Sequence, residues 1–108
     1  MINLNSGNEF LRVLEALSNP YRLKILAILF EESQYVSQLA RRLGISRPLL
    51  YLHLQKLEEV NLVKSHMEIS ETGKAMRYYE ANLFQIEINN AIIQNFAPSI
   101  TLKKRKEE

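Results

Sequence analysis

Positive charge gathers in one internal stretch of the chain. Between Val36 and Leu57 the sequence has four basic residues and no acidic residue. Guanidinium and ammonium groups bind phosphate, and a guanidinium can also bind the two acceptors on a guanine edge. The stretch therefore predicts a surface for a nucleic acid, although a solvated helix face can carry similar charges. The four residues are Arg41, Arg42, Arg47 and Lys56.

The residue types that most enzymes need are scarce. The chain has no cysteine and no aspartate, and its three glycines form no phosphate-binding loop. Its two histidines, His53 and His66, fall on different predicted elements, and no nucleophile has both a base and an orienting group. We therefore expect no enzyme, no disulfide, no metal site and no cofactor.

Length and composition predict one domain over residues 1–102. A chain of 108 residues that is 46% hydrophobic can bury a single core. Residues 103–108 hold four of the 14 basic and two of the 12 acidic residues, so they supply the whole net charge of +2. We expect this tail to be disordered and solubilising rather than an arm that binds nucleic acid. The chain offers no signal peptide and no apolar run of membrane-spanning length, so we expect a cytoplasmic protein without membrane contact.

Hydrophobic spacing predicts two helices in the first part of the chain. Leu11, Leu14 and Leu17 recur at helical spacing before "SNP" interrupts the pattern. Asn19 can cap a second helix, with Pro20 in its first turn, where the missing N–H costs nothing. The second helix is apolar on most sides and so should be central, with Arg22 and Lys24 as ordinary surface charges.

A helix-turn-helix pattern follows. "VSQLARRLG" predicts a short helix closed by Gly44, and Ser46 can cap the next helix, from Arg47 to about Val60. Spacings of three and four place Leu50, Leu54, Leu57 and Asn61 on its inward face. The outermost residues are then Pro48, Leu52, Gln55, Lys56 and Glu59, flanked by Arg47, Leu49 and Tyr51.

This outward face has the chemistry to read a DNA major groove. Arg47 could bind guanine or a phosphate, Gln55 could pair with adenine, and the Tyr51 hydroxyl could donate to a phosphate. Leu49 and Leu52 could pack on thymine methyl groups, but exposed leucines also occur singly on surfaces or contact other protein. His53, at the edge of the inward face, is expected to support the helix by bonding to the backbone.

Residues 62–81 predict a β-hairpin. "LVKSHMEIS" alternates with period two, "ETG" is a turn, and "KAMRYYEA" supplies a second strand. Lys64, Lys74 and Arg77 on this hairpin could reach the minor groove or phosphates, although exposed strands commonly carry such charges. The fold class is therefore mainly α with a small hairpin: a winged helix-turn-helix of about five helices and a two-stranded wing.

Helical spacing returns from Leu83 to Ala97 and ends at Pro98. Its hydrophobic residues cover more than one face, which exceeds what a core of this size can bury. We expect the terminal helices to meet a second copy of the chain. The candidate dimerisation residues are Phe10, Leu14, Leu83, Ile86 and Ile93.

Three segments in this order resemble the ArsR family of winged helix-turn-helix regulators: "LEALSNPYRLKIL", "VSQLARRLGISRPLLYLHLQKLEEVNLV" and "GKAMRYYEA". The resemblance covers nearly the whole chain, roughly residues 10–96. It implies a homodimer, joined by its first and last helices, that binds a pseudo-palindromic operator and represses transcription. A winged helix that docks another protein through Leu49, Tyr51 and Leu52 is the alternative.

The sequence departs from the metal-sensing members of that family. Where those members place a cysteine pair near the third helix, this chain has Tyr35 and Ser37. Where others place aspartate and histidines on the last helix, it has Gln85, Glu87, Asn89 and Asn90. We therefore expect a regulator that does not sense metal through these sites and whose effector, if it has one, is unknown.

Overall fold

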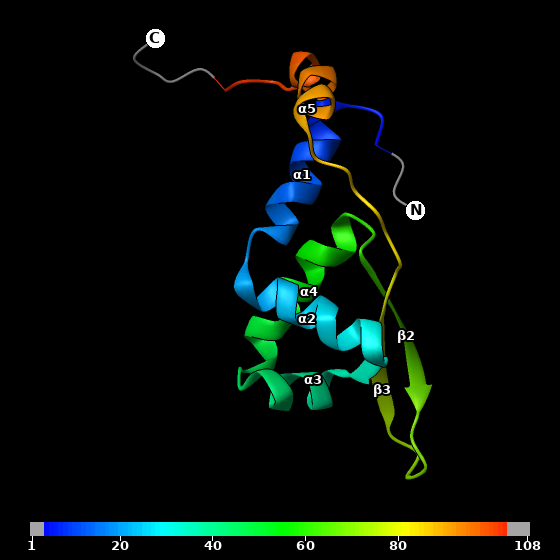
Figure 1. The fold of residues 1–108 in the computed structure, drawn as a ribbon. Helices are drawn as coiled ribbons and strands as arrows, with labels where there is room; N and C mark the ends of the chain where they lie inside the picture. The colour runs from blue at the N-terminus through cyan, green and yellow to red at the C-terminus, as the bar shows by residue number, and fades with distance from the viewer. Residues whose placement is uncertain (1–3, 104–108) are drawn as a thin grey trace.

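The computed structural model describes residues 4–103 and places the helices and strands in the predicted order (Figure 1). Over these residues five α-helices and a three-stranded antiparallel sheet form, and a short 3-10 helix, η1, follows the last α-helix. No helix among them is long and apolar enough to cross a membrane. The bounds are α1 Gly7–Leu17, α2 Pro20–Glu31, β1 Gln34–Tyr35, α3 Val36–Leu43, α4 Arg47–Glu59, β2 Val63–Ile69, β3 Ala75–Ala81, α5 Asn90–Phe96 and η1 Ala97–Ser99.

The predicted helix caps form. The Asn19 side chain accepts from the backbone N–H groups of Tyr21 and Arg22 at 2.9 and 3.2 Å, with Pro20 at the first position of α2. Gly44 ends α3 with a φ of 67°, in the left-handed region that favours glycine. Ser46 Oγ accepts from the backbone N–H of Leu49 at 3.3 Å. These local bonds fix the turn between α3 and α4.

The core lies between α2, α3, α4 and the sheet. Leu50, Leu54 and Leu57 are fully buried, which confirms the inward face predicted for α4. The expectation for Asn61 is wrong: α4 ends at Glu59, and Asn61 is exposed with a φ of 61°. An asparagine tolerates this left-handed conformation, so Asn61 turns the chain toward β2 instead of extending the helix.

The sheet contains the predicted hairpin and one further strand. Strands β2 and β3 pair from Val63 opposite Ala81 to Ile69 opposite Ala75, and β1 adds Gln34 opposite Tyr79 on the other edge of β3. Only the base of the hairpin belongs to the core, because Val63 is buried whereas Ile69 is 75% exposed. The tip therefore projects as a wing (Figure 1).

The predicted helix from Leu83 to Ala97 is wrong in its first half. Residues 82–88 have no regular secondary structure, and α5 begins only at Asn90, whose preceding residue Asn89 caps it by accepting from the Ile92 N–H at 2.9 Å. Phe84 and Ile86 are partly buried whereas their neighbours are exposed, so the segment buries alternate side chains as an extended chain does. Phe84 packs on the core with its ring 6.0 Å from that of Phe30. In this first half the hydrophobic residues therefore do not mark a helix.

This extended segment carries α5 away from the core to the far end of α1 (Figure 1). There Phe96 stacks on Phe10 at 4.8 Å, and the Gly7 N–H donates to Ser99 Oγ at 2.6 Å. A Cβ on Gly7 would collide with the Phe96 carbonyl oxygen, so glycine permits this close packing. We call α1, residues 82–89, α5 and η1 the arm, and the remaining elements the body.

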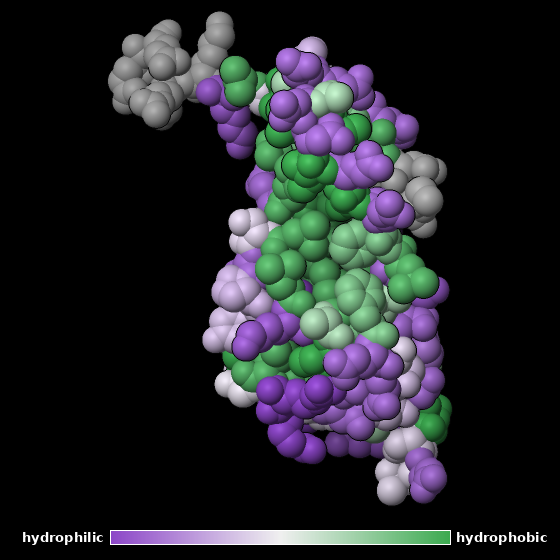
Figure 2. Space-filling view, viewed as in Figure 1, coloured by the Kyte–Doolittle hydropathy of each residue, from purple (hydrophilic) through white to green (hydrophobic). Residues whose placement is uncertain are grey.

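The protomer is elongated, with principal extents of 57 × 34 × 21 Å and a radius of gyration of 16.8 Å. A compact domain of this length has a radius of gyration of about 13 Å. The arm extends from the body, and it leaves hydrophobic surface uncovered between the two (Figure 2).

Candidate nucleic-acid interface

The outward face of α4 is open to solvent from its first residue to its last. Arg47, Pro48, Gln55 and Lys56 are exposed, and Leu52 is 61% exposed. Because the opposite face is packed into the core, the helix is held rigidly while these side chains stay free. The arrangement can insert a helix into a DNA major groove and can present hydrogen-bonding and apolar groups to base edges.

The residues around the turn divide into positioning and contact groups. The Ser46 hydroxyl is used as the cap of α4, so its part in the site is to fix where the helix begins. Arg41 and Arg42 lie exposed in the last turn of α3, immediately before that turn. From this position their guanidinium groups could bind phosphates beside a base contact made by α4.

The wing flanks one side of α4. Burial raises the pKa of Tyr79 on β3, and the Glu58 carboxylate and the Tyr51 hydroxyl raise it further. Helix α4 also packs against β2. At about 100° per residue Tyr51 and Glu58 share one side of α4. Tyr51 is 43% exposed, so it also borders the outward face of α4, which we call the reading face.

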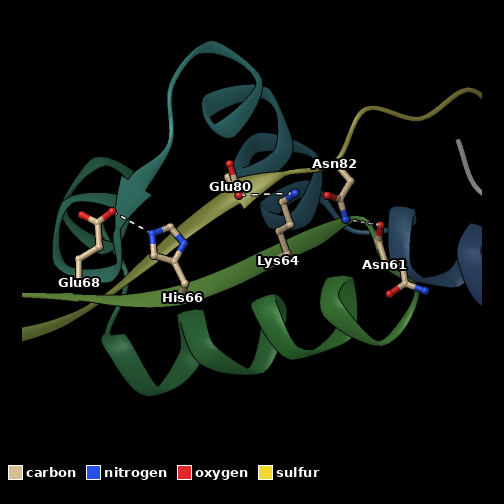
Figure 3. Close-up of polar contacts among 6 residues, drawn as sticks. All are labelled: Asn61, Lys64, His66, Glu68, Glu80 and Asn82. Atoms are coloured by element: carbon tan, nitrogen blue, oxygen red, sulfur yellow. Dashed lines mark hydrogen bonds and ion pairs between the residues drawn. The ribbon is translucent and has the colours of Figure 1, made fainter.

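The three predicted wing cations differ in how free they are. Lys64 pairs with Glu80 at 3.6 Å (Figure 3), and Arg77 donates to Ser65 Oγ at 2.9 Å. Lys74 is exposed beside the hairpin turn, where its own backbone N–H donates to Ser70 Oγ. Because Lys74 lies at the projecting end, it is the wing cation best placed to reach a groove.

Sequence reasoning missed the group that ties the wing to the rest of the sheet. The Tyr35 hydroxyl donates to Glu68 at 2.9 Å, and His66 Nε2 lies 2.8 Å from the other Glu68 oxygen (Figure 3). These bonds hold the pKa of Glu68 below its ordinary value, and the bond to Glu68 raises the pKa of Tyr35. Tyr78 packs between the Tyr35 and His66 rings. Only the pairing of β1 with β3 brings these residues together, so their spacing gave no signal.

Arg22 is not the ordinary surface charge predicted from the sequence. Its Nε donates to the Ala16 carbonyl at 2.6 Å, one terminal nitrogen donates to the Glu15 carbonyl at 3.3 Å, and the other lies 3.2 Å from His53 Nδ1. Arginine cannot accept a hydrogen bond, so His53 accepts through Nδ1 and is neutral. Burial, followed by the charge of Arg22, lowers the pKa of His53. His53 therefore bonds to Arg22 and not, as expected, to the backbone.

The candidate dimerisation residues lie in different settings. Phe10 is only 4% exposed because it packs inside the protomer on Phe96, so it shapes the arm from within. Leu14 and Ile86 are partly buried, whereas Leu83 is 81% and Ile93 is 51% exposed. Leu83 and Ile86 stand on the extended segment instead of the expected helix. Figure 2 shows a broad hydrophobic region on the face of the molecule that is turned to the viewer. Exposed aliphatic and phenylalanine side chains on α1, α2 and residues 82–93 are Leu11, Leu23, Phe30, Leu83, Ile88 and Ile93.

Within residues 4–103 no group of three or more histidine, cysteine, aspartate or glutamate side chains is arranged to hold a metal ion. Tyr35, which stands where metal-sensing family members place a cysteine, donates a hydrogen bond from its hydroxyl to Glu68. Gln85 and Glu87 lie on the extended segment, and Asn89 and Asn90 begin α5. The charged tail beyond Lys103 falls outside the described residues.

Comparison with known proteins agrees with this architecture. Residues 19–65 match the family described as "Bacterial regulatory protein, arsR family". The HTH-type transcriptional regulator MJ0229 of Methanocaldococcus jannaschii is 46% identical over 80 residues, which are 74% of this chain and 83% of that protein.

Several solved structures have a similar fold, and we describe two of them. The homodimeric winged helix-turn-helix DNA-binding domain of Mb0332 from Mycobacterium bovis is 27% identical, with a TM-score of 0.59 over 83% of this chain and 73% of that one. The transcriptional repressor BigR from Xylella fastidiosa is 29% identical, with a TM-score of 0.59 over 70% of this chain and 72% of that one. Their common fold is the winged helix-turn-helix.

Proposed function

Because this chain belongs to the arsR family of bacterial regulatory proteins, we propose that it is a homodimeric repressor that binds a pseudo-palindromic operator. The chain is a DNA-binding transcriptional regulator and not an enzyme. In our proposal the helix from Ser46 to Val60 enters the major groove, and residues 62–81 contact the flanking DNA as a wing. Residues 1–102 act as one DNA-binding and dimerisation domain, and residues 103–108 are a solubilising tail.

One observation carries the DNA-contact part of the proposal: the outward face of α4 stays exposed although the opposite face is fully buried. Arg47 stands in the first turn of α4, the part of a recognition helix that reaches deepest into a groove. Gln55 and Leu52 follow on the same face, where they can meet adenine and thymine edges. Phosphate contacts then fall to Arg41, Arg42, Tyr51, Lys56, Lys64, Lys74 and Arg77, with Ser46 and Pro48 setting the start of the helix.

The arm supports the homodimer. Its hydrophobic residues Leu83, Ile88 and Ile93 are more than half exposed in the part of the chain that the structure describes, and a second copy would cover them by a two-fold contact. Two copies of α4 would then face successive turns of the DNA, which requires a two-fold operator. The Mb0332 domain is homodimeric, which agrees with this assembly.

The repressor role is proposed from the likeness to BigR, a repressor, and from simple occlusion: a dimer that covers a promoter excludes other proteins from it. The proposed signal is not a metal ion at the family's usual positions, since Tyr35 and Ser37 are poor replacements for thiolate ligands. A small apolar molecule between the dimer helices, a covalent change or the abundance of the protein itself could provide the signal instead. We place the protein in the cytoplasm, where it would reach its operator.

Replacing Arg47 by alanine tests the DNA contact. We expect Arg47→Ala to weaken binding to the selected operator by about 1–3 kcal/mol and to relax the preference for the base that it contacts. The operator is first selected from random duplexes with the purified wild-type protein, and affinities are then measured by fluorescence anisotropy. Arg12→Ala, which removes an exposed arginine from α1, is the matched control and should bind as the wild type does.

The outcomes distinguish operator binding from protein docking as the function of this fold. A selected two-fold motif that Arg47→Ala binds weakly supports operator recognition. Unchanged binding would remove Arg47 from the reading face. If the wild-type protein selects no duplex, the DNA-contact proposal fails, and the protein-docking alternative through Leu49, Tyr51 and Leu52 takes its place.

A further inference from the structure

A basic groove lies between the start of α2 and the end of α3. It is open to solvent, has a volume of about 380 Å³ and is lined by Pro20, Tyr21, Lys24, Arg42 and Leu43. No acidic residue contributes to this lining. The larger cavity of about 590 Å³ beneath α1 differs, because Glu15 and Glu59 line it together with basic residues. The groove therefore favours an anion on charge alone.

The two cations of the groove are not neutralised by the protein. Over residues 4–103 the ion pairs are Lys64 with Glu80 and His66 with Glu68, so neither Lys24 nor Arg42 is paired with a carboxylate. Both residues are exposed, which leaves their charges able to meet a ligand without breaking an internal contact. Two unpaired positive charges around one hollow attract a polyanion.

The groove lies beside α4, on the side away from the wing. The Tyr21 ring stacks on that of His53 at 5.5 Å, and Arg22 bonds to the same histidine. At about 100° per residue, His53 lies about 60° to one side of the buried Leu50, and Tyr51 lies about 100° to the other side. In Figure 1 the start of α2 and the strands β2 and β3 lie on opposite sides of the molecule, so α2 and the wing flank opposite sides of the reading face.

We infer that the groove of Tyr21, Lys24 and Arg42 is a second phosphate-binding site. A helix in the major groove lies between two sugar-phosphate backbones. The wing reaches one backbone, and this groove reaches the other, with the lysine and arginine pairing to phosphates and the Tyr21 hydroxyl donating to a phosphate oxygen. The inference rests on the proposed binding of DNA by α4, and it gives Lys24 a role that the sequence did not indicate.

The salt dependence of operator binding tests this site. Each lost phosphate contact reduces the slope of log affinity against log salt by about 0.9. We therefore expect Lys24→Ala to reduce the slope by about that amount, so that a fourfold rise in salt costs the wild type about threefold more affinity than the variant. The loss should be equal on the selected operator and on an unrelated duplex, since phosphates carry no sequence. Lys24→Arg should restore the slope.

Lys103→Ala is the matched control, because it removes one exposed lysine beyond α5 and should leave the slope unchanged. Tyr21→Phe removes only the hydroxyl and keeps the ring on His53, so it should weaken binding without changing the slope. Ethylation of single phosphates in the operator should reduce wild-type binding at positions that no longer affect Lys24→Ala.

The outcomes also separate this inference from the proposed function. If the wild type selects a two-fold operator but Lys24→Ala keeps the wild-type slope, the second phosphate site is overturned while the operator-binding role stands. If Lys24→Ala lowers affinity for the operator alone and not for the unrelated duplex, the groove is not a phosphate site. Absence of duplex binding by the wild type would overturn both.

Discussion

The body and the arm of this protein use similar hydrophobic residues to different ends. In the body, Leu39, Leu50 and Leu57 are fully buried within one protomer. In the arm, α5 has no buried residue, and Leu83 and Ile93 are largely exposed. The body therefore completes its own core, whereas in our proposal a second copy of the chain removes the apolar surface of the arm from water.

The largest expected effect concerns the core of the body. Leu54 is fully buried on α4, so Leu54→Ala should lower the free energy of unfolding by about 2–5 kcal/mol through lost burial and the cavity left behind. Urea denaturation followed by circular dichroism measures it. Leu52→Ala is the same change on the exposed face and should lower the stability by less than about 0.5 kcal/mol. Equal losses would mean that the two faces of α4 are assigned wrongly.

The next effect concerns the arm. Ile93→Lys places a charge on its exposed apolar surface and should dissociate the dimer, which reduces affinity for a two-fold operator by about 100-fold because one half-site must then be bound alone. Analytical ultracentrifugation and anisotropy measure both changes. Gln94→Lys adds the same charge at an exposed polar position on the same helix and should remain dimeric. A dimeric Ile93→Lys would move the interface away from α5.

The smallest effect concerns the joint between arm and body, where Arg22 holds the last carbonyls of α1 and His53 of α4. The pKa of His53 is lowered from its ordinary value of 6.5, so the unfolded chain binds a proton that the folded chain resists. Stability should therefore be complete above pH 6.5 and should fall as the pH drops below it. Glu68 titrates below 4.5 and does not contribute to this window.

Urea titrations at pH 8, 6.5 and 5.5 compare the wild type with His53→Gln, which keeps an acceptor for Arg22. We expect the variant to lose less stability between pH 6.5 and 5.5 than the wild type does. An identical loss in the two proteins would show that other groups carry the pH dependence and that the histidine does not weaken the joint when it is protonated.

Much of the secondary structure of the body could be predicted from short-range patterns in the sequence. The caps at Asn19 and Ser46, the glycine at the end of α3, the inward leucines of α4 and the hairpin were all predicted and are confirmed. Each depends on residues only a few positions apart, so neighbouring side chains contain the information. The exposed residues of the reading face follow from the same helical geometry, although their contacts with DNA stay predictions.

The structural predictions that were wrong or missing concern contacts between segments that are distant in the sequence. The sequence predicted a helix from Leu83, but Phe84 finds its burial against Phe30 and the chain stays extended until the Asn89 cap. Hydrophobic residues alone cannot distinguish these outcomes, because periodicity in a short apolar segment is ambiguous. The same limit hid the contact of Tyr35 with Glu68, whose residues are 33 positions apart.

The sequence by itself determined the helix-turn-helix, its wing, and the resemblance that assigns the chain to a family of DNA-binding regulators. Local hydrogen bonds and side-chain periodicity carry that information. Only the tertiary structure decided that Arg22 joins three helices, that α5 packs on α1 instead of the core, and that Lys24 and Arg42 share one groove. These features depend on the packing of segments far apart in the chain, and their energies come from surfaces that are adjacent only after folding.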